Sequence, residues 1–180
     1  MGWREDVSPR HWKYSDAGSC RMGSDGPKSR NRMRASKSPL PSVWARRMGY
    51  GGLIPFVLLA LAIWVAEPAY RAFSGLALLG YGAVIASFLG AIHWGLVLRD
   101  ASGQSLALLG WGVAPCLVAW MSLMAGPALG LLLVAGLLWA CFAVDRVIYP
   151  RFQAQGWLPM RLTLTWVASA SCVVGAAGII

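Results

Sequence analysis

The sequence predicts an all-α integral membrane protein that crosses the bilayer five times and carries a disordered basic tail at its N terminus. Three observations lead to this fold class. The chain is 57% hydrophobic and only 13% charged, with a mean hydropathy of +0.56, whereas a soluble domain usually has about a quarter charged residues. Most of the charge lies before Met48. The rest of the chain contains apolar runs that are long enough to cross a bilayer.

Residues 1–46 form the first of two expected domains, a polar and basic tail. Eleven of the 16 Lys and Arg residues precede Met48, as do four of the 7 acidic residues. The tail has almost no aliphatic side chains and cannot bury enough apolar surface to fold alone. We expect a cytoplasmic, disordered extension whose charge can attract anionic lipid headgroups. Nucleic-acid binding is not expected, because no fold holds these basic side chains as a surface.

Residues 47–180 form the second expected domain, a bundle of five transmembrane helices. One span needs about 20 mostly apolar residues. The uncharged stretch 101–144 is about twice too long for a single span, so it must fold back on itself. Within "MAGPALG", Gly126 can turn and Pro127 suits the first position of a new helix. The apolar runs then predict spans near 49–66, 74–98, 105–124, 128–147 and 161–179.

The charges between the spans predict the orientation. If the tail is cytoplasmic, 15 of the 16 Lys and Arg residues lie on the inner side, and only Arg71 lies outside. Such an excess is typical of cytoplasmic segments. We therefore expect the N terminus inside and Ile180 outside. An organelle presequence, and with it the mitochondrial inner membrane, is the alternative, although acidic residues in the tail count against it.

Small residues mark the second expected span as the most tightly packed helix. Gly82, Ala86 and Gly90 recur every four residues, and Gly95 ends a second small-residue ridge beside them. Membrane helices associate where small residues let their backbones approach. We therefore expect a helix-packing face made of Gly82, Ala86, Gly90 and Gly95. His93 follows Gly90 by three residues, so its side chain should point to the same packed side.

Three ionisable residues are expected at one depth in the inner half of the membrane. His93 precedes Arg99 by six residues, or roughly 9 Å along a helix. Asp145 lies near the inner end of the fourth span, and Arg161 begins the fifth. Ionisable groups inside membranes usually find partners, so Asp145 could accept from the imidazole or pair with Arg146 or Arg161. One interpretation is a neutral histidine that donates a structural hydrogen bond, and the other is a proton relay or polar substrate site.

The sequence contains no motif of a soluble enzyme. No HExxH, P-loop or GxSxG element is present, and the 4 cysteines have no metal-like spacing. The 2 histidines, His11 and His93, cannot ligate a haem within one bundle. We therefore expect no catalytic activity, no cofactor and no metal ion.

Four stretches of the chain resemble a known family. They are "GYGGLIPF" (49–56), "YGAVIASFLGAIHWG" (81–95), "LGWGVAPCLVAW" (109–120) and "VDR" (144–146). They are similar to the domain of unknown function 3429 family, and the resemblance covers roughly residues 48–180. It implies a small multi-spanning protein of bacterial inner membranes, related to an animal mitochondrial transmembrane protein. It implies no activity.

Two classes of function remain open at the level of sequence. The leading expectation is a structural or assembly protein whose small-residue faces bind other helices, including those of a second copy. The competing expectation is a small transporter or proton-conducting protein centred on His93, with Asp145 and Arg161 near it. A water-accessible cavity that reaches His93 would favour transport, and a dry contact would favour packing.

Overall fold

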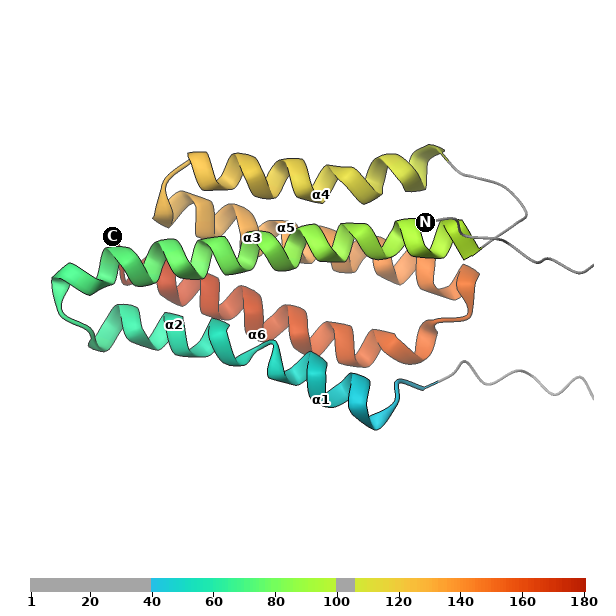
Figure 1. Ribbon diagram of the computed structural model, residues 1–180, viewed down its shortest axis with the longest axis horizontal. Helices are drawn as coiled ribbons and strands as arrows, with labels where there is room; N and C mark the ends of the chain where they lie inside the picture. Colours follow the sequence, from blue (N-terminus) through green and yellow to red (C-terminus); the bar gives the residue numbers. More distant parts are fainter. Residues whose placement is uncertain (1–39, 100–105) are drawn as a thin grey trace, which may run out of the picture. The chain divides into compact units, whose positions relative to one another are not determined.

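Helices make up all the regular structure in the computed structural model, which describes residues 40–99 and 106–180 (Figure 1). The elements are α1 (Val43–Gly51), α2 (Ile54–Val65), α3 (Pro68–Arg99), α4 (Leu106–Met124), α5 (Pro127–Ile148), η1 (Tyr149–Phe152), η2 (Gln155–Trp157) and α6 (Leu158–Ala177). They give 5 segments that are long and apolar enough to cross a membrane: Val43–Val65, Pro68–Arg99, Leu106–Met124, Pro127–Phe152 and Gln155–Ala177. The all-α class with five spans is therefore confirmed for this part of the chain. The expected tail lies outside the described residues as far as residue 39.

The first span begins earlier than the sequence indicated, at Val43 and not near residue 49. The side chain of Ser42 accepts a hydrogen bond from the backbone N–H of Ala45 at 3.2 Å and so caps α1. Arginine is a good helix former, and Arg46 and Arg47 therefore continue the helix. Residues 43–46, which the sequence analysis placed in the tail, belong to α1 in the structure.

A break after Gly51 divides the first span into α1 and α2. The proline in the first turn of α2, Pro55, has no backbone N–H to offer the preceding turn. The carbonyl of Gly52 accepts a hydrogen bond from the Tyr81 hydroxyl at 2.9 Å. The Tyr81 ring also meets Phe56 edge-on, with ring centroids 5.0 Å apart. These contacts tie the break to α3.

The central helix of the bundle is α3, which contacts α2, α4, α5 and α6. Figure 1 shows α4 and α2 on opposite sides of it. It begins at Pro68, earlier than the expected residue 74, and ends at Arg99. Its buried residues include Gly82, Ala86, Gly90 and His93. Contacts on all sides explain why this span carries so many small residues.

The reversal between α4 and α5 is confirmed at the expected residues. Gly126 caps α5 with a φ of 85°, a conformation that other residues rarely adopt. Pro127 is the first residue of α5, where the missing N–H has no cost.

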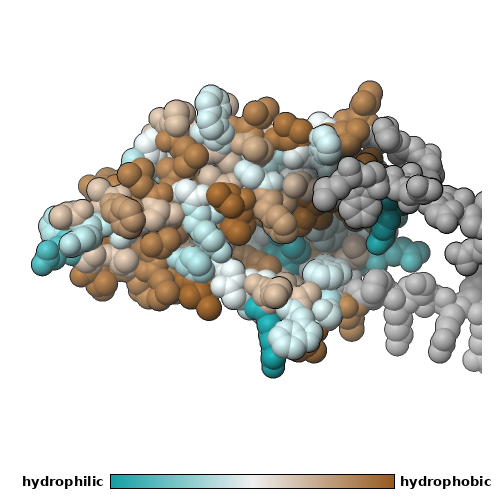
Figure 2. Space-filling model, viewed as in Figure 1, coloured by the Kyte–Doolittle hydropathy of each residue, from teal (hydrophilic) through white to brown (hydrophobic). Residues whose placement is uncertain are grey.

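The outside of the bundle is strongly apolar. Figure 2 shows hydrophobic side chains over much of the displayed face. Examples from three spans are Val84, Trp120 and Val147, which are 65%, 60% and 58% exposed. Water would oppose this much exposed apolar surface, whereas lipid tails suit it. The helices are therefore consistent with contact with a lipid bilayer.

Candidate functional site

Three ionisable side chains from three spans meet inside the bundle. They are His93 of α3, Asp145 of α5 and Arg161 of α6, and we refer to them as the polar cluster. Nε2 of His93 lies 3.3 Å from Oδ1 of Asp145. Nε of Arg161 donates to Oδ2 of Asp145 at 2.9 Å, and Nη2 of Arg161 donates to the same oxygen. Asp145 thus links the two other spans, one through each carboxylate oxygen.

The polar cluster is shielded from the surroundings of the bundle. His93 and Asp145 are each 1% exposed, and Arg161 is 8% exposed. Isolated charges are costly at such sites, so a buried carboxylate needs a partner. Arg161 supplies that partner. Arg146, the other candidate from the sequence, is exposed in the last turn of α5.

His93 contacts Asp145 without a well-formed hydrogen bond. Its Nε2 is close to Oδ1, but neither Nε2 nor Nδ1 has an aligned hydrogen-bond partner among the residues that the structure describes. The expected structural hydrogen bond from this histidine is therefore not formed in this geometry. The imidazole still packs directly against the carboxylate, so any change in its charge would act on Asp145.

Two further buried residues share the face of Asp145, and neither was predicted from the sequence as part of this site. Cys141 lies one turn before Asp145, and Tyr149 lies one turn after it. Cys141 is a free thiol. Tyr149 lines the same cavity as Arg161. The spacing of four residues on either side of Asp145 was the signal that could have found them.

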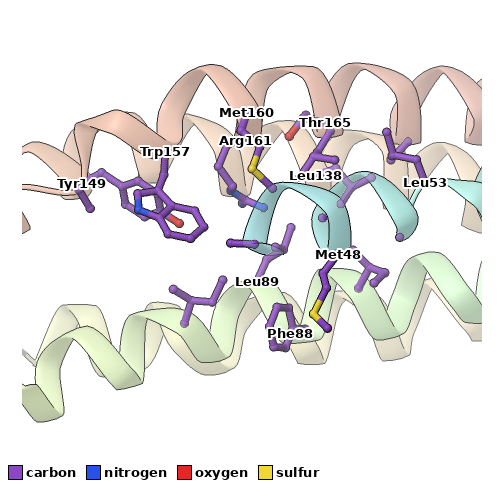
Figure 3. A pocket seen from close by; sticks show the side chains of 18 of the residues that line it. Met48, Leu53, Phe88, Leu89, Leu138, Tyr149, Trp157, Met160, Arg161 and Thr165 are labelled. Carbon is purple, nitrogen blue, oxygen red and sulfur yellow. The ribbon is translucent and has the colours of Figure 1, made fainter. Parts of the chain in front are cut away.

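A cavity of about 610 Å³ lies beside the polar cluster, between the first span, α3, α5 and α6. Most of its lining is apolar. Figure 3 shows Met48 and Phe88 near one another, with Met160 and Arg161 across the cavity. Of the polar cluster, only Arg161 lines the cavity, whereas His93 and Asp145 do not.

The expected packing face is buried at three of its four positions. A Cβ atom on Gly82 would lie 2.9 Å from Cγ1 of Val134 on α5. A Cβ on Gly90 would lie 2.6 Å from the backbone oxygen of Gly112 on α4. Ala86 is 0% exposed. Gly112 was not singled out from the sequence, although it is the residue that lets the backbones of α3 and α4 meet.

The fourth position, Gly95, does not belong to this face. It is exposed, and a Cβ atom there would meet nothing within 4 Å. At about 100° per residue, Gly95 lies about 140° around the helix from Gly90. Gly95 therefore takes no part in the contacts that α3 makes with the other helices of the bundle.

The structure offers no obvious metal site in residues 40–99 and 106–180. No group of 3 or more His, Cys, Asp or Glu residues lies close enough together there to hold an ion. What the polar cluster does provide is a charge-paired link between three spans, with one guanidinium on the wall of an apolar cavity.

The bundle and its buried charges define the class of the molecule: it is a polytopic helical membrane protein. The chain belongs to the family described as Protein of unknown function (DUF3429), whose model matches residues 41–177. The match includes all three residues of the polar cluster, and it confirms the resemblance to this family. No curated protein and no solved structure matches the chain.

Proposed function

We propose that this protein is a non-enzymatic membrane scaffold that binds transmembrane helices, first of all those of a second copy of itself. A groove on the outside of the bundle carries the proposal. The groove measures about 290 Å³ and lies between α4 and α5. Its lining includes two small exposed residues of α5, Gly136 and Ala140, and also Pro115 and Val118 of α4.

Small residues four positions apart are what close helix association in lipid requires. A Cβ atom on Gly136 would meet nothing within 4 Å, so its backbone is open to a partner helix. The neighbouring α4 is also a peripheral helix, because 22% of its apolar segment is buried in the bundle, compared with 44% for α5. Both features leave lateral surface for a partner.

The polar cluster suits a scaffold because it acts as an internal clamp. It joins α3, α5 and α6 at one level through Asp145. Removing one partner of a buried ion pair typically costs about 3–5 kcal/mol. Such a link fixes how the three spans sit against one another, and a fixed bundle presents a constant outer surface to a partner.

A small transporter or proton-conducting protein centred on His93 is the second candidate. The observation in its favour is that Arg161 lines the large cavity, which brings an ionisable group to an open space. Against it, the cavity stops short of His93 and Asp145, both of which are 1% exposed. The dry contact therefore favours packing.

For its location, we infer a bacterial inner membrane, with the mitochondrial inner membrane as the alternative. The tail would be cytoplasmic and Ile180 outside. Arginines gather at the end of the bundle where α1 begins, with Arg46 and Arg47 in α1 and Arg99 at the end of α3. Arg71 lies in the first turn of α3, at the opposite end. This asymmetry supports the orientation, and the basic tail would then face anionic headgroups.

The scaffold proposal is tested by the association of two copies in a bilayer. The full chain, labelled with one fluorophore per copy, is reconstituted at several protein-to-lipid ratios, and photobleaching steps are counted. The wild type should form dimers. Gly136→Leu should weaken dimerisation about tenfold, which corresponds to about 1.4 kcal/mol.

The matched control is Gly95→Leu, since Gly95 is also exposed on a span but lies on α3, outside the groove. This variant should dimerise like the wild type. A wild type that stays monomeric at every protein-to-lipid ratio would contradict the proposal. So would equal dimerisation of the wild type and the Gly136→Leu variant.

A further inference from the structure

We propose that the large cavity is a binding site for an anionic phospholipid from the surrounding leaflet, with the phosphate held between Arg99 and Arg161. Both arginines line the cavity, and the described residues that line it include no carboxylate. Arginine pairs well with phosphate because its guanidinium presents several donors in a plane.

The cavity opens sideways, toward the lipid. Met48 of α1 and Phe88 of α3 both line it, yet these side chains are 78% and 62% exposed. Figure 3 shows them close together at one side of the cavity. A wall whose residues face both the cavity and the outside is an entrance. A lipid can therefore enter between α1 and α3 without leaving its leaflet.

The interior of the cavity suits an acyl chain. Its inner wall contains Phe56, Leu138 and Ala168, which are 1%, 2% and 4% exposed. The volume of about 610 Å³ lies within the range of about 300–1,000 Å³ that is typical of small-molecule sites. An apolar space of this size is better filled by hydrocarbon than by water.

The end of the cavity away from Leu53 contains amphipathic aromatic side chains. Tyr149 and Trp157 lie together at one end of Figure 3, and Leu53 lies at the other. Tyrosine and tryptophan are common at headgroup depth. Arg99 is exposed at the end of α3. Cations and amphipathic rings therefore stand where a headgroup would lie, and apolar residues stand where its chains would lie.

Asp145 leaves Arg161 able to serve this site. Asp145 accepts from Nε and Nη2 of the guanidinium, both through Oδ2. A guanidinium has five N–H donors, so the pairing with Asp145 engages only one edge. Basic pockets between spans on the cytoplasmic side are a recurring way to bind anionic headgroups. Only the identity of the leaflet, the cytoplasmic one, rests on the orientation proposed above.

Native mass spectrometry of the full chain in detergent tests the site. Phosphatidylglycerol and phosphatidylcholine with identical acyl chains are titrated separately, and oleic acid is a third probe. The wild type should bind phosphatidylglycerol more tightly than phosphatidylcholine. Arg99→Gln should weaken phosphatidylglycerol binding about fivefold and phosphatidylcholine binding less, because the choline cation of phosphatidylcholine offsets the charge of its phosphate.

Two matched controls isolate the cavity. Arg71→Gln removes the same charge at the opposite end of the bundle and should change nothing. Ile92→Trp fills the cavity and should weaken both phospholipids, whereas Val84→Trp places the same ring on the outer surface of α3 and should have no effect. If Ile92→Trp fails to fold, the Arg99 and Arg71 pair still decides, because both arginines are exposed.

Equal binding of the two phospholipids by the wild type would overturn the proposal. An Arg99→Gln variant with unchanged phosphatidylglycerol binding would overturn it too. Tighter binding of oleic acid than of phosphatidylglycerol would show that the site takes a carboxylate and would reject the phospholipid assignment.

Discussion

Asp145 is the residue on which the interior of the bundle depends. It is the only acidic residue in the polar cluster, and it meets a guanidinium through Oδ2 and an imidazole through Oδ1. The two contacts differ in kind, because Arg161 donates two hydrogen bonds whereas His93 is close but not aligned. Loss of the Asp145–Arg161 pair should therefore cost more stability than loss of the contact between Asp145 and His93.

This asymmetry predicts different outcomes for His93→Gln and Asp145→Leu. Glutamine keeps a polar group but cannot titrate, and interhelical hydrogen bonds in membranes average only about 0.6 kcal/mol. His93→Gln should therefore change the free energy of unfolding by less than about 1 kcal/mol. Asp145→Leu leaves Arg161 buried without a counter-ion and should cost about 3–5 kcal/mol. Thermal unfolding of the purified protein in detergent measures both.

Proton flux in proteoliposomes is the second measurement for the His93→Gln variant. A scaffold should show no flux above that of empty vesicles, with or without His93. Flux through the wild type that is lost in a folded His93→Gln variant would contradict the scaffold proposal and support proton conduction.

At the scale of elements, the crossing of α3 and α4 is the closest approach on the expected packing face. Gly90 and Gly112 face one another there, and Nε1 of Trp94 donates to the carbonyl of Leu109 at 3.0 Å. The contact is between backbones, so no flexible side chain can move aside to make room.

Gly90→Leu should therefore be strongly destabilising, whereas Gly95→Leu should be nearly neutral. Overpacking typically costs about 1–3 kcal/mol, and at Gly90 we expect the upper end, because the new Cβ would meet the backbone oxygen of Gly112 at 2.6 Å. The two glycines lie on the same helix and receive the same side chain, so helix propensity alone should not separate them. Melting temperatures in detergent provide the comparison, and similar losses for both variants would refute the crossing.

The sequence predicted the features that depend on composition and on short-range chemistry. The lengths of the apolar runs predicted the spans. The backbone preferences of glycine and proline, at Gly126 and Pro127, predicted the reversal between α4 and α5. The common depth of His93, Asp145 and Arg161 also followed from counting residues to the span ends. Each of these needs only the geometry of one helix.

Features that need the neighbouring helices were missed. Residues four positions apart on a helix differ by about 40° around its axis. A row of such residues therefore turns gradually from one face of the helix to another. The ridge that starts at buried Ala83 passes Ser87 and exposed Ala91 and has left the core at Gly95. The cavity could not be foreseen either, because its wall combines residues of the first span, α3, α5 and α6.

For the molecule as a whole, the proposed lipid site lies at one of the two ends of the bundle. The cavity, Arg99 and Trp157 lie at the end where α1 begins, whereas α6 finishes at the other (Figure 1). The outer groove shares no residue with the cavity, and Arg161 is the residue that the clamp in the core and the proposed lipid site have in common. Of these proposals, only the leaflet that supplies the lipid depends on the orientation of the chain in the bilayer.

That orientation is the last prediction. Because the described residues contain 5 spans, an odd number, the start of α1 and Ile180 must lie on opposite sides of the membrane. Arg46, Arg47, Arg99 and Arg151 favour the cytoplasm for the end where α1 begins. A reporter that is active only outside the cytoplasm should therefore be active when fused after Ile180 and inactive when fused after Arg151. A fusion after Glu67, between α2 and α3, serves as the outside control. Activity after Arg151 together with silence at Ile180 would mean that the bundle is inverted, and silence at both positions would mean that the number of spans is wrong.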